Sequence, residues 1–226
     1  MDSYKKNITC NLGTSKIEKL IDFDIIFGIK LINMNSKNEL LKISSCKKLI
    51  ISKNKIEELK NIPKQIEVLD CNYNLLKELP ELPEKLLSVY CQCNKITSLE
   101  NLPQNLKHLN CSFNKLVRLE NLPFELKFLD CSYNQLVNLD YLPNSLEVLI
   151  CISNTIEYFD CLPNSLIEFD CDRNNIKTLD NLPSSIKILS CSSNTKLEIN
   201  NLPLIEKIYI DKKLNVNLDG VRIIKK

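Results

Sequence analysis

The chain has 226 residues, of which 44% are hydrophobic and 26% charged, and its formal net charge is +2. This apolar fraction excludes a disordered chain, and the near-neutral charge argues against a dedicated nucleic-acid binder, which needs a basic excess to contact phosphates. The N-terminus lacks the apolar core of a secretory signal, and the apolar stretch 21–32 contains three charged residues, so neither export nor membrane insertion is expected.

Residues 1–45 are expected to form an N-terminal cap. Ile26, Ile29 and Leu31 match positions 1, 4 and 6 of the repeat that begins at Cys46, which indicates a degenerate repeat just before the regular array. Residues 15–27 are expected to close the end of the core, because the end of a repeat array must be shielded from water. The sequence leaves open whether they form a helix or a strand. It does not assign Cys10 to any position of the repeat.

Residues 46–204 consist of eight copies of a 20-residue repeat. Its pattern is Leu-x-x-Leu-x-Cys-x-x-Asn-x-Leu-x-x-Leu-x-x-Leu-Pro-x-x, and the last copy is one residue short. Position 9 is Asn and position 18 is Pro in all eight copies, while position 6 is Cys in every copy except the first, which has Ile51. Self-similarity at a fixed period of this length is the signature of a repeat architecture.

The spacing of the apolar positions predicts one short strand per repeat. Positions 4 and 6 point to the same side of an extended segment, whereas positions 3 and 5 point to the other side. Positions 11, 14 and 17 bring three further apolar side chains back to the same interior, and only a neighbouring copy can cover them. We therefore expect stacked repeats that form a parallel sheet with the core behind it.

The Asn and Pro positions predict how the rest of each repeat is built. The Asn amide offers two donors and an acceptor, so stacked copies are expected to form a ladder that satisfies backbone groups of their own and the adjacent repeat. Leu-Pro at positions 17 and 18 favours an extended rather than a helical return. Because strands lie about 4.8 Å apart, whereas packed helices need about 8–10 Å, an extended return predicts a shallow arc.

This motif, as it stands in residues 106–123, resembles the leucine-rich-repeat family, and the 20-residue period with Leu-Pro is most similar to the short repeats of secreted bacterial effectors. The resemblance implies a leucine-rich-repeat solenoid with a non-helical convex side. Some of those effectors carry a C-terminal ubiquitin-ligase domain with a catalytic cysteine. Only 23 residues follow Pro203, so that activity is not carried over. The seven cysteines at position 6 depart from the family, which usually has Leu, Ile or Val there.

Residues 205–226 are expected to form a degenerate last repeat and the C-terminal cap. Ile205, Ile208 and Ile210 keep the strand pattern, but Lys213 stands where the array has Asn. Residues 221–223 are expected to add one further strand.

The eleven cysteines and the single histidine do not form a recognisable chemical site. Seven cysteines occupy the inward position 6, twenty residues apart and without a Cys-x-x-Cys pair, so we interpret them as reduced and buried rather than as metal ligands or disulfides. Cys93 and Cys161 are the predicted exposed thiols. His108 lies in a different column from Cys93, and no catalytic motif is present, so no enzymatic activity, metal or cofactor is expected.

The outward positions 3, 5 and 8 of repeats two to five combine aromatic with hydrogen-bonding residues on the expected concave face. Such a mixture is typical of the centre of a protein interface, although aromatic residues also favour strands and stack on cross-strand neighbours without any ligand. Because the fold leaves this face uncovered, we interpret it as a binding surface. The candidate partner-binding residues are Tyr73, Tyr90, His108, Asn110, Phe113, Phe128, Asp130 and Tyr133.

These features favour a cytoplasmic, non-enzymatic module that binds a protein partner rather than nucleic acid or a membrane, and that is a monomer rather than an obligate oligomer. The alternative is a self-associating structural or scaffold component, and a third class is an enzyme. The resemblance to effectors implies a host-cell partner. The Asn-, Lys- and Ile-rich composition indicates an AT-rich genome such as that of a giant virus or a protist, and in a virus the location would be the host cytoplasm.

Overall fold

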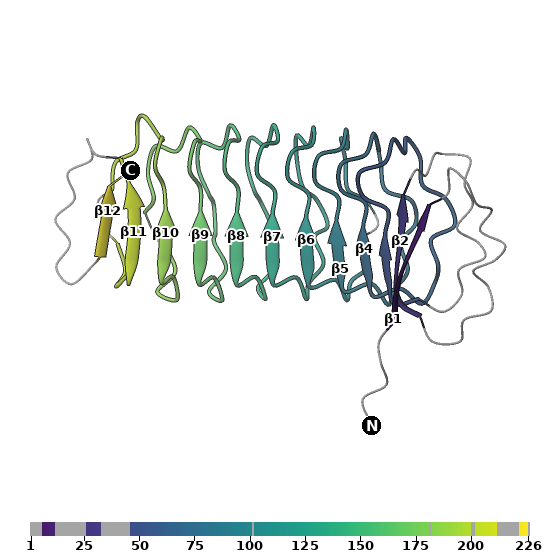
Figure 1. Cartoon of the computed structure of the whole chain (residues 1–226). Coiled ribbons are helices and arrows are strands. Elements are labelled where there is room, and N and C mark those ends of the chain that lie inside the picture. The colour runs from purple at the N-terminus through teal and green to yellow at the C-terminus, as the bar shows by residue number, and fades with distance from the viewer. Residues whose placement is uncertain are drawn as a thin grey trace, which may run out of the picture.

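The computed structural model describes residues 6–11, 26–32, 46–100, 102–180, 182–199, 202–211 and 222–225, the first two ranges through their backbone alone. The described strands form one parallel sheet in which neighbours in sequence are neighbours in space (Figure 1). These ranges contain no helix, and therefore none that could cross a membrane. The strands are β1 (Lys6–Asn11), β2 (Ile26–Ile32), β3 (Lys48–Ile50), β4 (Val68–Asp70), β5 (Ser88–Tyr90), β6 (His108–Asn110), β7 (Phe128–Asp130), β8 (Val148–Ile150), β9 (Glu168–Asp170), β10 (Ile188–Ser190), β11 (Lys207–Ile210) and β12 (Arg222–Lys225).

The strand register follows the sequence period. Between β6 and β7, His108 lies opposite Phe128, and Asn110 lies opposite Asp130. The same offset of twenty residues holds from β3 to β10, so each position of the repeat forms a straight column across the sheet. The predicted parallel sheet of stacked repeats is confirmed.

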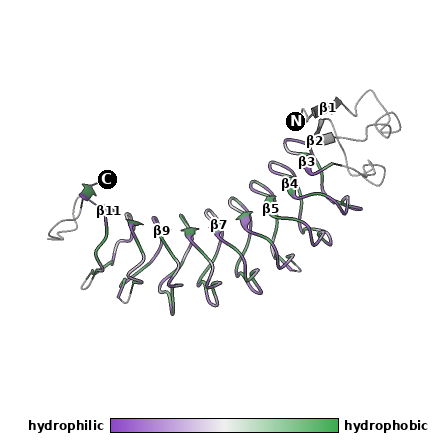
Figure 2. Ribbon diagram, turned by 90° about the horizontal axis from the view of Figure 1, so that it is seen from below, coloured by the Kyte–Doolittle hydropathy of each residue, from purple (hydrophilic) through white to green (hydrophobic). Residues whose placement is uncertain are grey.

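The core runs along the whole array behind the sheet. Positions 1, 4 and 6 are buried in every copy, and position 11 is buried in all copies except the last, where Lys196 is exposed. Figure 2 shows the strands on the inner side of an open arc and the return segments on its outer side. The fold is the leucine-rich-repeat solenoid that the sequence predicts.

The return segments are extended, as predicted, and each junction between copies is a turn that begins at the proline. The N–H of Leu126 donates to the carbonyl oxygen of Pro123 at 3.1 Å, and the equivalent hydrogen bond recurs at all seven junctions of the array. Proline accepts but has no N–H to donate, so it fits the first position of this turn.

The Asn residues at position 9 form the predicted ladder. The Nδ2 of Asn134 donates to the carbonyl oxygens of Cys131 and Ser132 in its own repeat and to that of Cys111 in the preceding repeat, at 3.0–3.1 Å. Its Oδ1 accepts the N–H of Leu116, also in the preceding repeat, at 3.0 Å. Each amide therefore satisfies buried backbone groups of two copies at once.

The cysteines at position 6 form a second ladder. The thiol of Cys71 donates to the carbonyl oxygen of Tyr90 in the next repeat at 3.4 Å, and Cys171 makes the same contact with Ser190 at 3.3 Å. Burial raises the pKa of these thiols well above its ordinary value, and it raises the pKa of Cys46 to about 11. The position-6 cysteines are buried in the core, as predicted, and the ten cysteines whose side chains the structure describes are free thiols.

The strand predictions at both ends are confirmed as well. Ile29 of β2 lies opposite Leu49, in the register of a degenerate repeat, and β12 adds a strand beside β11. The structure also contains β1, which the sequence left unassigned, and pairs Cys10 with Leu31 in the column of position 6. The predicted closing element at 15–27 lies outside the described residues except for its last two.

Candidate functional site

The concave face carries the side chains at positions 3, 5, 7 and 8 of the repeats. Among the described residues, no segment lies over this face, and the return segments run along the opposite side of the arc (Figure 2). The side chains of positions 3 and 5 leave each strand on the side opposite the core, as alternation along a strand requires. Every candidate partner-binding residue predicted from the sequence lies on this face.

Phe113 and Tyr133 form the most exposed aromatic pair of the face. Their rings are parallel, with centroids 4.1 Å apart and planes inclined by 9°. Phe113 is 49% exposed and Tyr133 is 38% exposed. The stack therefore presents a rigid apolar surface to solvent in the middle of the array.

The backbone at position 8 places these rings. In all eight copies this residue has a φ between 52° and 59°, the left-handed region, although no copy has glycine there. For a residue with a Cβ this conformation costs about 1–2 kcal/mol. The N–H of Phe113 donates to the carbonyl oxygen of Ser132 at 2.9 Å, which continues the interstrand hydrogen bonding beyond the end of β6.

Phe128 and His108 form a second stack, on position 3 of the same two repeats. Their ring centroids lie 5.2 Å apart and the planes are inclined by 21°. Between the two stacks, on position 5, the Nδ2 of Asn110 donates to the carboxylate of Asp130 at 3.1 Å. Six of the eight predicted residues are therefore brought together on two adjacent repeats. They are His108, Asn110, Phe113, Phe128, Asp130 and Tyr133.

The other two predicted residues lie nearer the N-terminal end of the array. Tyr73 is 49% exposed, and the Nζ of Lys53 lies 5.8 Å from its ring centroid. Cys93 separates Tyr73 from Phe113 in the column of position 8 and is half-buried, whereas Cys161 is exposed as predicted. Tyr90 lies half-buried on β5, opposite Asn110.

Sequence reasoning missed the contribution of position 7, which it did not include among the outward positions. Asp172 occupies this position and is buried, and its Oδ1 accepts hydrogen bonds from the hydroxyl of Ser190 at 2.8 Å and from the N–H of Ser192 at 2.7 Å. The sequence does carry a sign that position 7 faces outward, because this position is polar in most copies and directly follows the inward cysteine.

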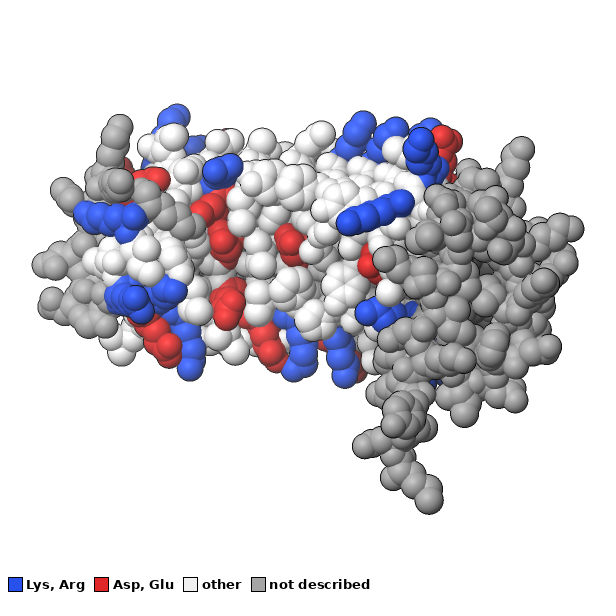
Figure 3. Space-filling view, in the orientation of Figure 1, with Lys and Arg blue, Asp and Glu red and all other residues white. Residues whose placement is uncertain are grey.

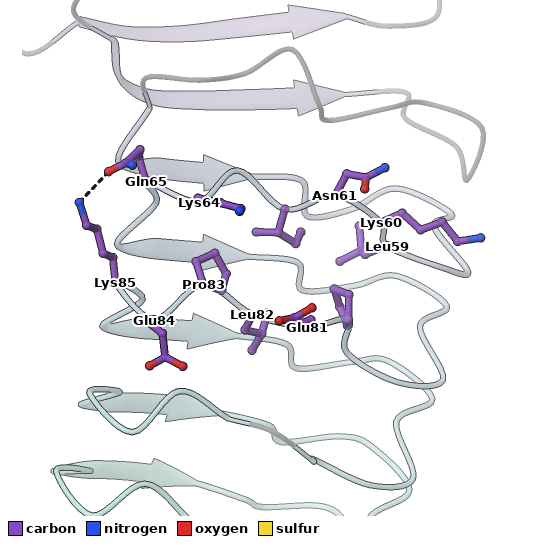
Figure 4. A pocket seen from close by; sticks show the side chains of 12 residues that line it. Leu59, Lys60, Asn61, Lys64, Gln65, Glu81, Leu82, Pro83, Glu84 and Lys85 are labelled. Atoms are coloured by element: carbon purple, nitrogen blue, oxygen red, sulfur yellow. Dashed lines mark hydrogen bonds between the residues drawn. The ribbon is translucent and has the colours of Figure 1, made fainter.

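The outer side of the arc offers a different kind of surface. An open cleft of about 750 Å³ lies between the first two returns, lined among others by Leu59, Leu82 and Pro83 (Figure 4). Lysine and glutamate side chains alternate around it, and Lys85 donates to Gln65 across its edge at 2.8 Å. Because both charges line the cleft, it favours neither an anionic nor a cationic ligand.

No catalytic or metal-binding arrangement is seen in the described part of the chain. No group of three or more His, Cys, Asp or Glu residues there is placed to hold a metal ion. His108 packs against a phenyl ring, and the position-6 thiols lie in the core.

Among the solved structures that this one resembles are bacterial leucine-rich-repeat proteins. YopM from Yersinia enterocolitica WA-314 aligns over 91% of this chain and 52% of its own, with 25% identity and a TM-score of 0.65. YopM of Yersinia pestis, described as a leucine-rich effector protein, aligns over 68% of this chain and 45% of its own, with 36% identity and a TM-score of 0.62. The chain thus spans about half the length of both.

A third structure shares the fold at lower identity. The functional domain of InlJ from Listeria monocytogenes, described as including a cysteine ladder, aligns over 94% of this chain and 59% of its own, with 21% identity and a TM-score of 0.64. No protein-family model and no curated protein sequence matches the chain. These bacterial neighbours give no support to the viral or protist source that composition suggested.

Proposed function

We propose that this chain is a non-enzymatic module that binds a protein partner on its concave sheet face, with the Phe113–Tyr133 stack at the centre of the contact. The observation that carries the proposal is that two large aromatic side chains stand stacked and exposed on an uncovered face. Aromatic anchors dominate the binding energy of protein interfaces.

The surroundings of the stack suit an interface. Polar groups next to it, such as the Asn110 amide and the Asp130 carboxylate, can fix the orientation of a partner, while the rings provide apolar area. The similarity to YopM, a leucine-rich effector, supports a partner from a host cell and action in the host cytoplasm. Nothing in the described residues calls for a cofactor.

Capture of partners from a lysate of the native cell tests the proposal. The variant with Phe113→Ala and Tyr133→Ala is expected to lose the partners that the wild-type chain retains. The matched control replaces Tyr141 and Tyr158, two exposed aromatic residues outside the concave face, with alanine. Equal capture by the wild type and the Phe113/Tyr133 variant would exclude this face as the binding site.

Sedimentation distinguishes the second candidate, a self-associating scaffold. A binding module of this kind is expected to remain a monomer over a wide range of concentrations. A sedimentation coefficient that rises with concentration, and that the Phe113/Tyr133 variant abolishes, would instead assign the face to contacts between copies of the chain.

A further inference from the structure

We propose that the partner bound on the Phe113–Tyr133 stack carries an acidic segment, and that its carboxylates contact Lys95 and Lys115 on the rim beside the stack. This inference rests on the proposed function and specifies the chemistry of the partner. The rim in question lies beyond the ends of the strands and is formed by positions 10, 12 and 13 of the repeats.

The rim is extended backbone that keeps the order of the sheet. The N–H of Lys115 donates to the carbonyl oxygen of Ile96 in the preceding repeat at 2.8 Å, and the N–H of Lys95 donates to that of Leu76 at the same distance. In repeats three to five, position 11 is buried, whereas positions 10 and 12 on either side of it are exposed. The side chains of positions 10 and 12 therefore point away from the core, in columns whose members lie about 4.8 Å apart.

Positive charge gathers on this rim over repeats two to five. In Figure 3, lysine and arginine side chains lie along the upper rim, the one toward which the strands run, and they flank an uncharged stretch in its middle. Positions 10, 12 and 13 of these four repeats contain four basic residues and one acidic residue, namely Lys77, Lys95, Lys115, Arg118 and Glu78. This excess is local, because the whole chain carries a net charge of only +2.

Lys95 and Lys115 are the part of this charge that is not balanced. They are neighbours in the column of position 10, both are exposed, and within the described part of the chain neither side chain forms an ion pair. On the opposite rim, by contrast, Lys127 pairs with Glu147 of the next repeat. Like charges side by side repel each other. A carboxylate between the two ammonium groups would remove that repulsion.

Apolar side chains border Lys115 on both sides. Phe113 lies two residues before it in the same repeat, and Val117 lies two residues after it. Val117 and Val137 are exposed and occupy adjacent copies of position 12, just as Phe113 and Tyr133 occupy adjacent copies of position 8. A partner segment with an apolar anchor and neighbouring carboxylates complements this arrangement in shape and in charge.

Nucleic acid is the other polyanion that a pair of lysines attracts, and it fits this rim less well. Its binding depends on neutralising a run of phosphates. Beyond repeat four, position 10 changes to Gln135, Thr155 and Asn175, so its positive charge ends beside the aromatic stack. A short acidic stretch next to an apolar anchor matches this extent better than a long phosphate backbone.

Three labelled peptides that differ only in charge test the inference with the full chain. They contain Glu-Glu-Leu-Glu-Glu, Gln-Gln-Leu-Gln-Gln or Lys-Lys-Leu-Lys-Lys between identical Gly-Ser flanks, so the test assumes no direction or register of the segment. Fluorescence anisotropy at low ionic strength measures their binding. The acidic peptide is expected to bind tightest.

A pair of double variants locates the contact. Lys95→Gln with Lys115→Gln is expected to weaken the acidic peptide about fivefold, because two exposed ion pairs are lost. The matched control is Lys107→Gln with Lys127→Gln, which removes the same charge from adjacent repeats on the opposite rim. The control is expected to leave the affinity nearly unchanged.

The outcomes separate this inference from the proposed function. Equal affinity for the three peptides, no measurable binding of the acidic one, or equal effects of the two double variants would overturn the acidic-segment inference. A labelled oligothymidylate that binds more tightly than the acidic peptide, through the same two lysines, would overturn it in favour of nucleic acid. Partner capture from the lysate would still depend on Phe113 and Tyr133 if only the charge inference is wrong. Loss of that dependence, by contrast, would end the proposed function itself.

Discussion

The side-chain amide of Asn114 donates a hydrogen bond to the carbonyl oxygen of Cys91, 23 residues earlier, at 3.0 Å, and another to the carbonyl oxygen of Cys111 in its own repeat at the same distance. One buried side chain thus joins two turns of the solenoid. Because the core itself is shared between neighbouring copies, this contact is part of what keeps the concave face in register.

Asn114→Ala is expected to lower the free energy of unfolding by about 1–3 kcal/mol, because it leaves buried backbone groups of two repeats without partners. Urea unfolding followed by circular dichroism measures the change. Ser192→Ala is the control, because the Oγ of Ser192 is buried without a hydrogen-bond partner among the described residues, and its removal should cost nothing. A loss no larger than that of the control would show that the Asn ladder is not a source of stability.

The stability of the fold is expected to fall as the pH rises above about 8.5, the ordinary pKa of a cysteine thiol. Burial raises the pKa of seven described thiols in the folded state, so the unfolded chain releases these protons first and is favoured at alkaline pH. Each thiol contributes a slope of up to about 1.4 kcal/mol per pH unit between its unfolded and folded pKa values. Urea titrations at pH 7 to 10 measure the slope.

A single replacement in the ladder checks the cause of that slope. Cys131→Ala removes one buried thiol and should make the decline with pH shallower, even though the variant is less stable at neutral pH because of the cavity. A free energy of unfolding that stays constant up to pH 10 in the wild type would contradict the buried, protonated state of the cysteines.

The native thiols are expected to differ sharply in their reactivity. Iodoacetamide at pH 8 should modify the exposed Cys161 first and the half-buried Cys93 more slowly, while the position-6 thiols react only after unfolding. Mass spectrometry of peptides from native and urea-treated protein reports the order. Rapid modification of Cys131 in the native protein would mean that position 6 faces solvent.

Ser153→Gly is expected to raise the free energy of unfolding by about 0.5–1 kcal/mol. Its φ of 54° is unfavourable for a residue with a Cβ, and glycine relieves that cost at the expense of some flexibility in the unfolded chain. Ser153→Ala keeps the Cβ and should leave stability nearly unchanged. If glycine and alanine give the same stability, the left-handed backbone at position 8 carries no strain.

The sequence predicted the parts of this molecule that follow from periodicity. The spacing of Leu109, Cys111 and Asn114 was sufficient to predict the strand, the inward thiol and the amide ladder, because each occurs at the same place in nearly every copy. The strand around Cys10 was missed, since its segment has no Asn or Pro at the matching positions and lies 21 residues before Leu31.

The geometry of the concave face was harder to predict. Position 8 ranges from Lys53 to Phe113 to Ser153 and never contains glycine, so nothing in its composition indicated left-handed backbone. The pairing of Phe113 with Tyr133 depends on how that backbone directs the rings, and the placement of Asp130 between two stacks depends on the register of three columns, at positions 3, 5 and 8. Residue types alone do not fix either relationship.

Site-specific photocrosslinking in the native cell tests the concave-face interface most directly. The photoreactive residue p-benzoyl-phenylalanine replaces Phe113 in one protein and Tyr141, which is 97% exposed outside the concave face, in another. Crosslinking of a distinct protein from position 113, and not from position 141, is the expected result. No crosslink from position 113, or the same set of products from both positions, would contradict a binding site on the concave face.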